Sequence, residues 1–180
     1  MNTDQSTFTE AEAREIDAWC AEIRAAHAIM SAPIEDGDPR LAELLELRGG
    51  YAKQLAPEDL GELYFTYSQS KPAWPLPSPV WAVTTTLLSG TYPEMVVQFE
   101  GQEWKGGRFY AQISQQYTVF VDDFIDTEGD VSFPCGDFHT NPPIIWVSEN
   151  VEGLTWQDAM LLATTTRNAA VELRDYELAE

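Results

Sequence analysis

Four runs of β-forming residues between Val80 and Phe124 constrain the fold more than any other part of the chain. They cover residues 80–88, 94–100, 108–113 and 117–121, and each is rich in Val, Thr, Ile, Phe and Tyr. Turn-forming residues follow the runs, namely Ser89-Gly90, Gly101, Gly106-Gly107 and Ser114-Gln115-Gln116. Alternate positions are apolar, which predicts one buried face made by Met95, Val97, Phe99, Phe109, Ala111, Ile113, Tyr117, Val119 and Val121. This pattern predicts an antiparallel β-meander.

Helices are expected before and after the meander in the sequence. Thr9 and Glu12 match a capping box, Asp38-Pro39 has the pattern of a second helix start, and a third helix should begin near Pro57. After the meander, two short strands are expected at 131–133 and 144–147, and Thr155 with Asp158 caps a last helix. The apolar face of that helix should consist of Ala159, Leu162, Ala163, Thr166, Ala169, Ala170 and Leu173.

These elements predict an α+β fold with a C-terminal helix packed on a sheet of four to six strands. We expect one domain over 1–180. It comprises a helical N-terminal region (1–68), a proline-rich joint (69–79) that places Trp74 in the core, and the sheet with its C-terminal helix (80–180).

Net charge limits the partners that the chain can bind. Ten Lys and Arg stand against thirty Asp and Glu, a net charge of −20, and residues 61–120 are nearly neutral while both flanks are acidic. Direct binding to nucleic acid or to an anionic membrane surface is therefore not expected, because phosphate binding depends on Lys and Arg. A basic protein is the partner whose charge complements that of this chain. The alternative is that the negative charge serves only to keep the protein soluble.

Cysteine content and the N-terminus indicate a location in the cytoplasm, or in the host cytoplasm if the chain is phage-encoded. Cys20 and Cys135 are too few for a disulfide scaffold, the first residues show no signal-peptide pattern, and no stretch of about 18 apolar residues occurs.

Candidate chemistry is sparse. Cys135, Asp137 and His139 could in principle bind a metal or activate a nucleophile, but paired ligand dyads are missing, so neither a metal site, a cofactor nor a catalytic residue is predicted. The acidic turn of Asp122, Asp123, Asp126, Glu128 and Asp130 fails the calcium-loop template, because its glycine is out of register. A solvated acidic turn is expected there.

The C-terminal part carries a resemblance. Pro142 to Val147, then Leu154-Thr155, Asp158-Ala159 and the alanine-rich helix are similar to the C-terminal ends of many small acidic proteins of actinobacteria and their phages, over about the last 45 residues. Most of those proteins are uncharacterised, so the resemblance implies a phage or mobile-element origin and no particular activity.

The sequence thus favours an intracellular interaction protein that binds and modulates a basic protein partner. The most specific form of this hypothesis is nucleic-acid mimicry. Its interaction residues would be Tyr92 and Trp104, as exposed aromatics, together with the acidic turn. Two alternatives stay open: a structural component of a phage or protein assembly, in which the chain self-associates, and a small enzyme with an unrecognised site.

Overall fold

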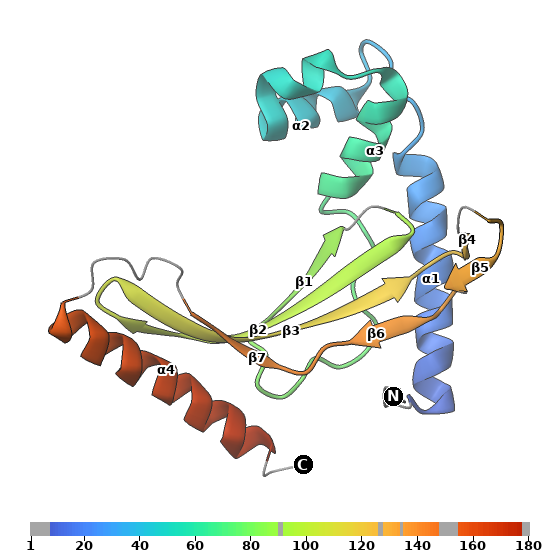
Figure 1. Ribbon diagram of the computed structural model, residues 1–180. Coiled ribbons are helices and arrows are strands. Elements are labelled where there is room, and N and C mark those ends of the chain that lie inside the picture. The colour runs from blue at the N-terminus through green and yellow to red at the C-terminus, as the bar shows by residue number, and fades with distance from the viewer. Residues whose placement is uncertain (1–7, 90–91, 126–127, 134, 148–154, 178–180) are drawn as a thin grey trace. The chain divides into compact units, whose positions relative to one another are not determined.

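The structure is a computed structural model that describes residues 8–89, 92–125, 128–133, 135–147 and 155–177 (Figure 1). It has the α+β fold expected from the sequence. The helices are α1 (Glu10–Met30), α2 (Pro39–Arg48), the 3₁₀ helix η1 (Gly49–Gln54), α3 (Pro57–Tyr67) and α4 (Trp156–Glu177). The strands are β1 (Thr84–Ser89), β2 (Glu94–Gly106), β3 (Phe109–Phe120), β4 (Phe124–Ile125), β5 (Val131–Phe133), β6 (Phe138–Thr140) and β7 (Ile144–Val147).

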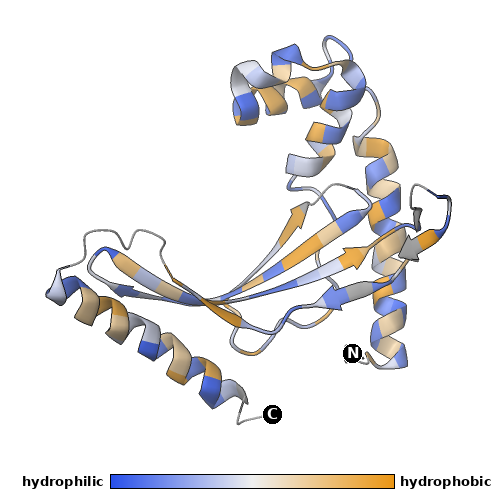
Figure 2. Ribbon diagram, viewed as in Figure 1, coloured by the Kyte–Doolittle hydropathy of each residue, from blue (hydrophilic) through white to orange (hydrophobic). Residues whose placement is uncertain are grey.

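Five strands form the main antiparallel sheet. Its order is β1-β2-β3-β6, and β7 also pairs with β3, so that Ala111 lies opposite Val147 and Ser114 opposite Ile144. Strands β4 and β5 form a separate two-stranded sheet. The predicted buried face is confirmed for Met95, Val97, Phe99, Phe109, Ala111, Ile113, Val119 and Val121, all at most 1% exposed. Figure 2 shows this alternation of apolar and polar residues along β2 and β3.

Two of the expected turns in the meander are wrong. Strand β2 continues through Gly101 to Gly106. A Cβ at position 101 would lie 3.3 Å from the Trp81 carbonyl oxygen and 3.3 Å from the Ile113 Cβ. The glycine is needed for close packing and not for a turn.

Strand β3 likewise runs without a break through Ser114, Gln115 and Gln116. Ser114 pairs with Ile144, and the Asn141 amide donates to the Gln116 carbonyl oxygen at 3.1 Å. Three polar residues therefore lie within a strand whose buried face stays in phase, because an even number of positions separates Ile113 from Tyr117.

The chain divides into two compact units, each assembled from separate segments. The first, the helical unit, comprises Met1–Leu76, Leu88–Val96 and Val119–Phe138, and the second, the sheet unit, comprises Pro77–Leu87, Val97–Thr118 and His139–Glu180. One boundary falls inside the proline-rich stretch 69–79, which forms neither helix nor strand. Within the helical unit, Trp74 of this stretch is half-buried and packs edge-on against Trp19, with ring centroids 5.4 Å apart.

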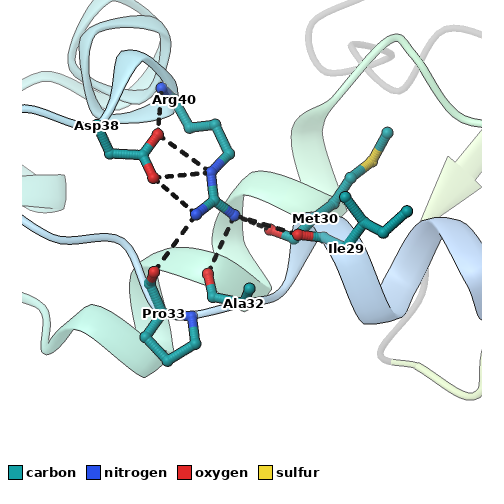
Figure 3. Close-up of polar contacts among 6 residues, drawn as sticks. All are labelled: Ile29, Met30, Ala32, Pro33, Asp38 and Arg40. Carbon is teal, nitrogen blue, oxygen red and sulfur yellow. Dashed lines mark hydrogen bonds and ion pairs between the residues drawn. The ribbon is translucent and has the colours of Figure 1, made fainter.

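Arg40 joins the start of α2 to the end of α1 (Figure 3). Asp38 caps α2, as expected, and accepts three further bonds from the Arg40 guanidinium at 2.7, 3.1 and 3.2 Å. The same guanidinium donates to the carbonyl oxygens of Met30 (2.8 Å) and Ala32 (3.0 Å), at and just beyond the end of α1. Arg40 therefore satisfies carbonyls that the end of α1 leaves without helical partners.

Helix α4 of the sheet unit begins with the expected capping box, since Thr155 and Asp158 exchange hydrogen bonds of 3.1 and 3.2 Å. Part of its expected face is confirmed, since Ala169 is buried and Leu162, Thr166 and Leu173 are half-buried. Ala159, Ala163 and Ala170 are exposed instead, and Thr165, outside the expected face, is buried. The reason is the close approach of the β2–β3 turn, where a Cβ on Gly106 would clash with the Thr165 hydroxyl and lie 3.3 Å from the Leu161 carbonyl oxygen.

Among the described residues, none of the helices combines the length and the apolar composition that crossing a bilayer requires.

Candidate functional site

The sheet unit contains a groove with a volume of about 560 Å³, called the sheet groove below. Polar side chains make up most of its lining, with two aromatic rings and two further apolar residues. The lining residues are Gln98, Glu100, Tyr110, Gln112, Ser114, Gln115, Gln116, Asn141, Pro142, Ile144 and Trp146.

Hydrogen bonds among side chains organise the polar part of the sheet groove. The Gln98 amide donates to Glu100 Oε1 at 2.7 Å, and the Gln116 amide reaches Gln98 Oε1 at 3.4 Å. Gln112 is held by the Gly101 carbonyl oxygen at 3.1 Å, and Gln115 by that of Asn141 at 2.9 Å. These bonds hold the amides in place and leave further donor and acceptor sites, since each amide can make up to four hydrogen bonds.

Tyr110 and Trp146 form the aromatic part of the sheet groove. Their ring centroids lie 5.2 Å apart, and Trp146 is 37% exposed. Among the described residues, Glu100 is the only acidic one in the lining, and none of the lining residues described is Lys, Arg or His. The groove therefore suits a neutral polar ligand better than an anion.

A second, smaller groove lies in the helical unit. It has a volume of about 360 Å³ and is called the helical groove below. Its apolar lining consists of Ile34, Leu41, Leu45, Ala52, Leu55, Pro57 and Leu60, and its charged lining of Glu35, Asp36 and Lys53. Ile34 and Leu60 belong to the core of the unit, and the Ile34 amide donates to the Pro57 carbonyl oxygen at 2.9 Å. The groove thus has a fixed apolar floor beside two exposed carboxylates and the exposed Lys53 ammonium group, so its charged lining is negative by one.

Tyr92 and Trp104, which the sequence marks as exposed aromatics, are both half-buried. Tyr92 stacks on His27 with ring centroids 3.7 Å apart, and its hydroxyl donates to Asp122 Oδ2 at 3.2 Å. Burial, with the Asp122 carboxylate as a second cause, raises the pKa of Tyr92 to about 12. The Trp104 indole donates to Glu172 Oε2 of α4 at 2.7 Å. Both residues therefore stabilise their own unit, and a role of either in binding stays a prediction.

Two carboxylates of the acidic turn hold neighbouring groups of the chain. Asp122 accepts the Tyr92 hydroxyl, and Asp123 Oδ1 accepts the Cys135 amide at 2.9 Å. Glu128 and Asp130 are exposed beside the β4–β5 hairpin, and Asp126 lies outside the described residues.

The structure does not bring Cys135, Asp137 and His139 together as a cluster of metal ligands. Across the described ranges, no three side chains of His, Cys, Asp or Glu converge in the way that a metal ion requires. The Cys135 sulfur instead lies against α1, where Arg24 Nη1 donates to it at 2.7 Å. Cys20 of α1 is fully buried beside it.

Comparisons with known proteins do not assign a family. No family model matches the chain, and neither the curated proteins nor the solved structures contain a match.

Sequence reasoning missed both grooves. The polar face of the sheet groove has a sequence signal, the alternation Tyr110-x-Gln112-x-Ser114-x-Gln116, which the assumption of a turn concealed. The helical groove has none, because its lining comes from a loop and three helices whose packing the sequence does not display.

Proposed function

We propose that the protein is an acidic interaction protein, and that its helical groove binds a basic segment of a protein partner. The observation that carries this proposal is the combination of an apolar floor with the Glu35 and Asp36 carboxylates in one groove. An apolar side chain of the partner would enter the groove, while neighbouring Lys or Arg residues would meet the carboxylates.

The distribution of charge supports a basic partner. The helical unit contains 21 Asp and Glu against 6 Lys and Arg, a net charge of −15, and the sheet unit contains 9 against 4, a net charge of −5. Eight of the ten Lys and Arg contact groups of the chain itself: Arg14, Arg24, Arg40, Arg48, Lys71, Lys105, Arg108 and Arg174. The chain therefore carries an excess of negative charge, thirty Asp and Glu against ten Lys and Arg, and a basic partner would be attracted at long range.

The resemblance of the C-terminal residues supports a phage or mobile-element origin, in which such a protein would modulate a host protein. If the partner itself binds nucleic acid, the carboxylates would occupy the place of phosphates, and the protein would act as a nucleic-acid mimic.

A matched pair of variants tests the helical groove. The probe is a fluorescent peptide of about 15 residues, rich in Lys and Arg with two Leu anchors, and the control peptide has Ser in place of Leu. The double change Glu35→Gln and Asp36→Asn should weaken binding roughly three- to tenfold, as expected for two partly screened charges. The double change Glu15→Gln and Glu22→Gln removes the same charge from exposed positions of α1, outside the groove, and should have less than half of that effect on the binding free energy.

Equal weakening by both double variants would contradict the helical groove as the site and would leave only unspecific charge attraction. Equal affinity for the Leu and Ser peptides would contradict the role of the apolar floor.

The sheet groove favours a second function, binding of a neutral saccharide. Amide and hydroxyl groups of Gln98, Gln112 and Ser114 can exchange hydrogen bonds with sugar hydroxyls, and the Tyr110 and Trp146 rings offer apolar faces for the C–H side of a sugar.

Calorimetry with neutral oligosaccharides tests this second function. Gln112→Ala and Trp146→Ala should abolish binding, whereas Gln102→Ala and Trp156→Ala, at exposed positions outside the groove, should retain it. Equal effects of the two pairs, or no heat with any neutral sugar, would remove this second function.

A further inference from the structure

The fold of the helical unit brings together the only two cysteines of the chain, which lie 115 positions apart in the sequence. Cys20 is fully buried on α1, whereas Cys135 is exposed in the segment between β5 and β6, and both are free thiols. Asp17, about one turn before Cys20 on α1, and Arg24, about one turn after it, both lie against the Cys135 segment. The Cys135 side chain is also one of the groups that raise the pKa of Cys20. Neither the fold expected from the sequence nor the proposed binding function requires this juxtaposition.

Hydrogen bonds independent of the sulfur atoms fix the Cys135 segment to the end of β3 and to the acidic turn, and its Gly136 lies next to α1. The Cys135 amide donates to Asp123 Oδ1 at 2.9 Å, and the Gly136 amide donates to the Phe120 carbonyl oxygen at 2.8 Å. Gly136 has φ +81°, and a Cβ on it would lie 3.0 Å from Asp17 Oδ1 of α1, so glycine suits this position both in conformation and in space. The backbone thus fixes the position of Cys135 at α1.

Arg24 lies one helical turn after Cys20 on α1 and contacts the sulfur of Cys135. Its Nη1 atom donates to the Val121 carbonyl oxygen at 2.5 Å and to Cys135 Sγ at 2.7 Å, and Cys135 Sγ also approaches the Val121 carbonyl oxygen at 3.3 Å. A guanidinium next to an exposed sulfur is the environment in which protein thiols react with oxidants. Cys20 is different, since burial raises the pKa of its thiol to about 12 and keeps it protonated.

We propose that Cys20 and Cys135 form a reversible intramolecular disulfide when the protein meets a peroxide. In the first step, the Cys135 sulfur attacks one peroxide oxygen, an S–O bond forms, the O–O bond breaks, and the leaving hydroxide takes a proton to become water. In the second step, the Cys20 sulfur displaces the hydroxyl group of the Cys135 sulfenic acid, and the proton of Cys20 leaves with that hydroxyl as water. Two thiols are oxidised to one disulfide, and one hydrogen peroxide is reduced to two waters.

This disulfide would link α1 to the segment that follows the acidic turn. It would close a loop of more than 100 residues in the unfolded chain, so the oxidised protein should be harder to unfold. The thermal midpoint should rise by about 10 °C and return after reduction.

The experiment treats the reduced full chain with hydrogen peroxide and measures intact mass and free thiols without a binding partner. We expect a mass loss of about 2 Da, the disappearance of both thiols, and recovery of both with dithiothreitol. Cys135→Ser should leave the buried Cys20 thiol unoxidised in the folded protein. Cys20→Ser should stop the reaction at the sulfenic acid of Cys135, which a dimedone-type reagent traps.

Arg24→Gln tests the role of the guanidinium, because it should slow the loss of Cys135 thiol several-fold while the disulfide remains the product. Two results would overturn the proposal: two free thiols after peroxide treatment, or oxygen addition at Cys135 and dimers linked through Cys135 in place of the 2 Da loss.

Discussion

Replacement of Gly61 by Ala should destabilise the helical unit. Gly61 is buried on α3, and a Cβ built on it would lie 2.7 Å from the Ala32 carbonyl oxygen and still closer to that of Ser31. Both oxygens belong to the backbone, and the Ala32 carbonyl is also held by the Arg40 guanidinium at 3.0 Å. Neither can rotate away as a side chain would, so α1 and α3 would have to separate.

The size of the effect follows from two opposing contributions. Overpacking against the backbone should cost about 3 kcal/mol, at the upper end of the usual range. Alanine should regain about 1 kcal/mol of helix propensity relative to glycine. The net loss is then about 2 kcal/mol, which corresponds to a fall of roughly 4–8 °C in the thermal midpoint.

Urea unfolding followed by far-ultraviolet circular dichroism measures this loss. Gly50→Ala is the matched control, because no atom lies within 4 Å of its Cβ position, and its stability should stay within about 0.5 kcal/mol of wild type. A Gly61→Ala protein as stable as wild type would refute the close approach of α3 to the end of α1. It would also contradict the close packing of these segments that holds the Ile34 amide against the Pro57 carbonyl oxygen at the helical groove.

Three further predictions concern other contacts. Arg40→Ala should lower the free energy of unfolding by about 2–4 kcal/mol, because it leaves carbonyls at the end of α1 unsatisfied. Arg40→Lys should restore only part of this loss, because an ammonium group lacks the planar fork of the guanidinium. Urea unfolding measures both variants, and an Arg40→Ala protein as stable as wild type would contradict this role. Burial lowers the pKa of Lys71 from 10.5 to about 8, so the unfolded chain binds more protons between these values and wild type should gain stability from pH 8 to 10.5, by about 1–2 kcal/mol after allowance for solvent screening. Unfolding across this pH range should show no such gain in Lys71→Met, and an unchanged gain there would assign it to another group. Gly106→Ala should displace α4 by its clash with Thr165 and lower the thermal midpoint by several degrees, and an unchanged midpoint would contradict that contact.

Local patterns in the sequence suffice to predict the helices and the buried side of the sheet. The capping residues Thr9, Asp38 and Thr155 act within a few positions of themselves, and strand alternation depends only on the pleat. Gly101 could not be interpreted correctly in this way, because glycine favours turns and close packing alike. Only the position of Trp81, twenty residues away, decides between them.

The candidate sites depend even more on tertiary packing. Glu35 and Asp36 precede α2, but the apolar floor beside them includes Leu55 and Leu60, which reach it only after α3 has folded back. The position of Cys135 next to the part of α1 that carries Cys20 likewise has no local signal, since each cysteine alone has the pattern of an ordinary core or loop residue. The acidic character of the flanks was evident from the sequence, but the groove in which it could act was not.

The most direct test of the proposed function maps the bound peptide on the protein. A methyl-labelled sample is titrated with the Lys- and Arg-rich Leu peptide at about 0.1 M salt and again at about 0.5 M, where the Debye length shortens to about 4 Å. We expect shifts concentrated on the methyl groups of Ile34, Leu41, Leu45, Leu55 and Leu60, with weaker binding at the higher salt concentration. Shifts confined to residues outside the helical groove, or no saturable shifts at either salt concentration, would contradict a basic partner bound in this groove.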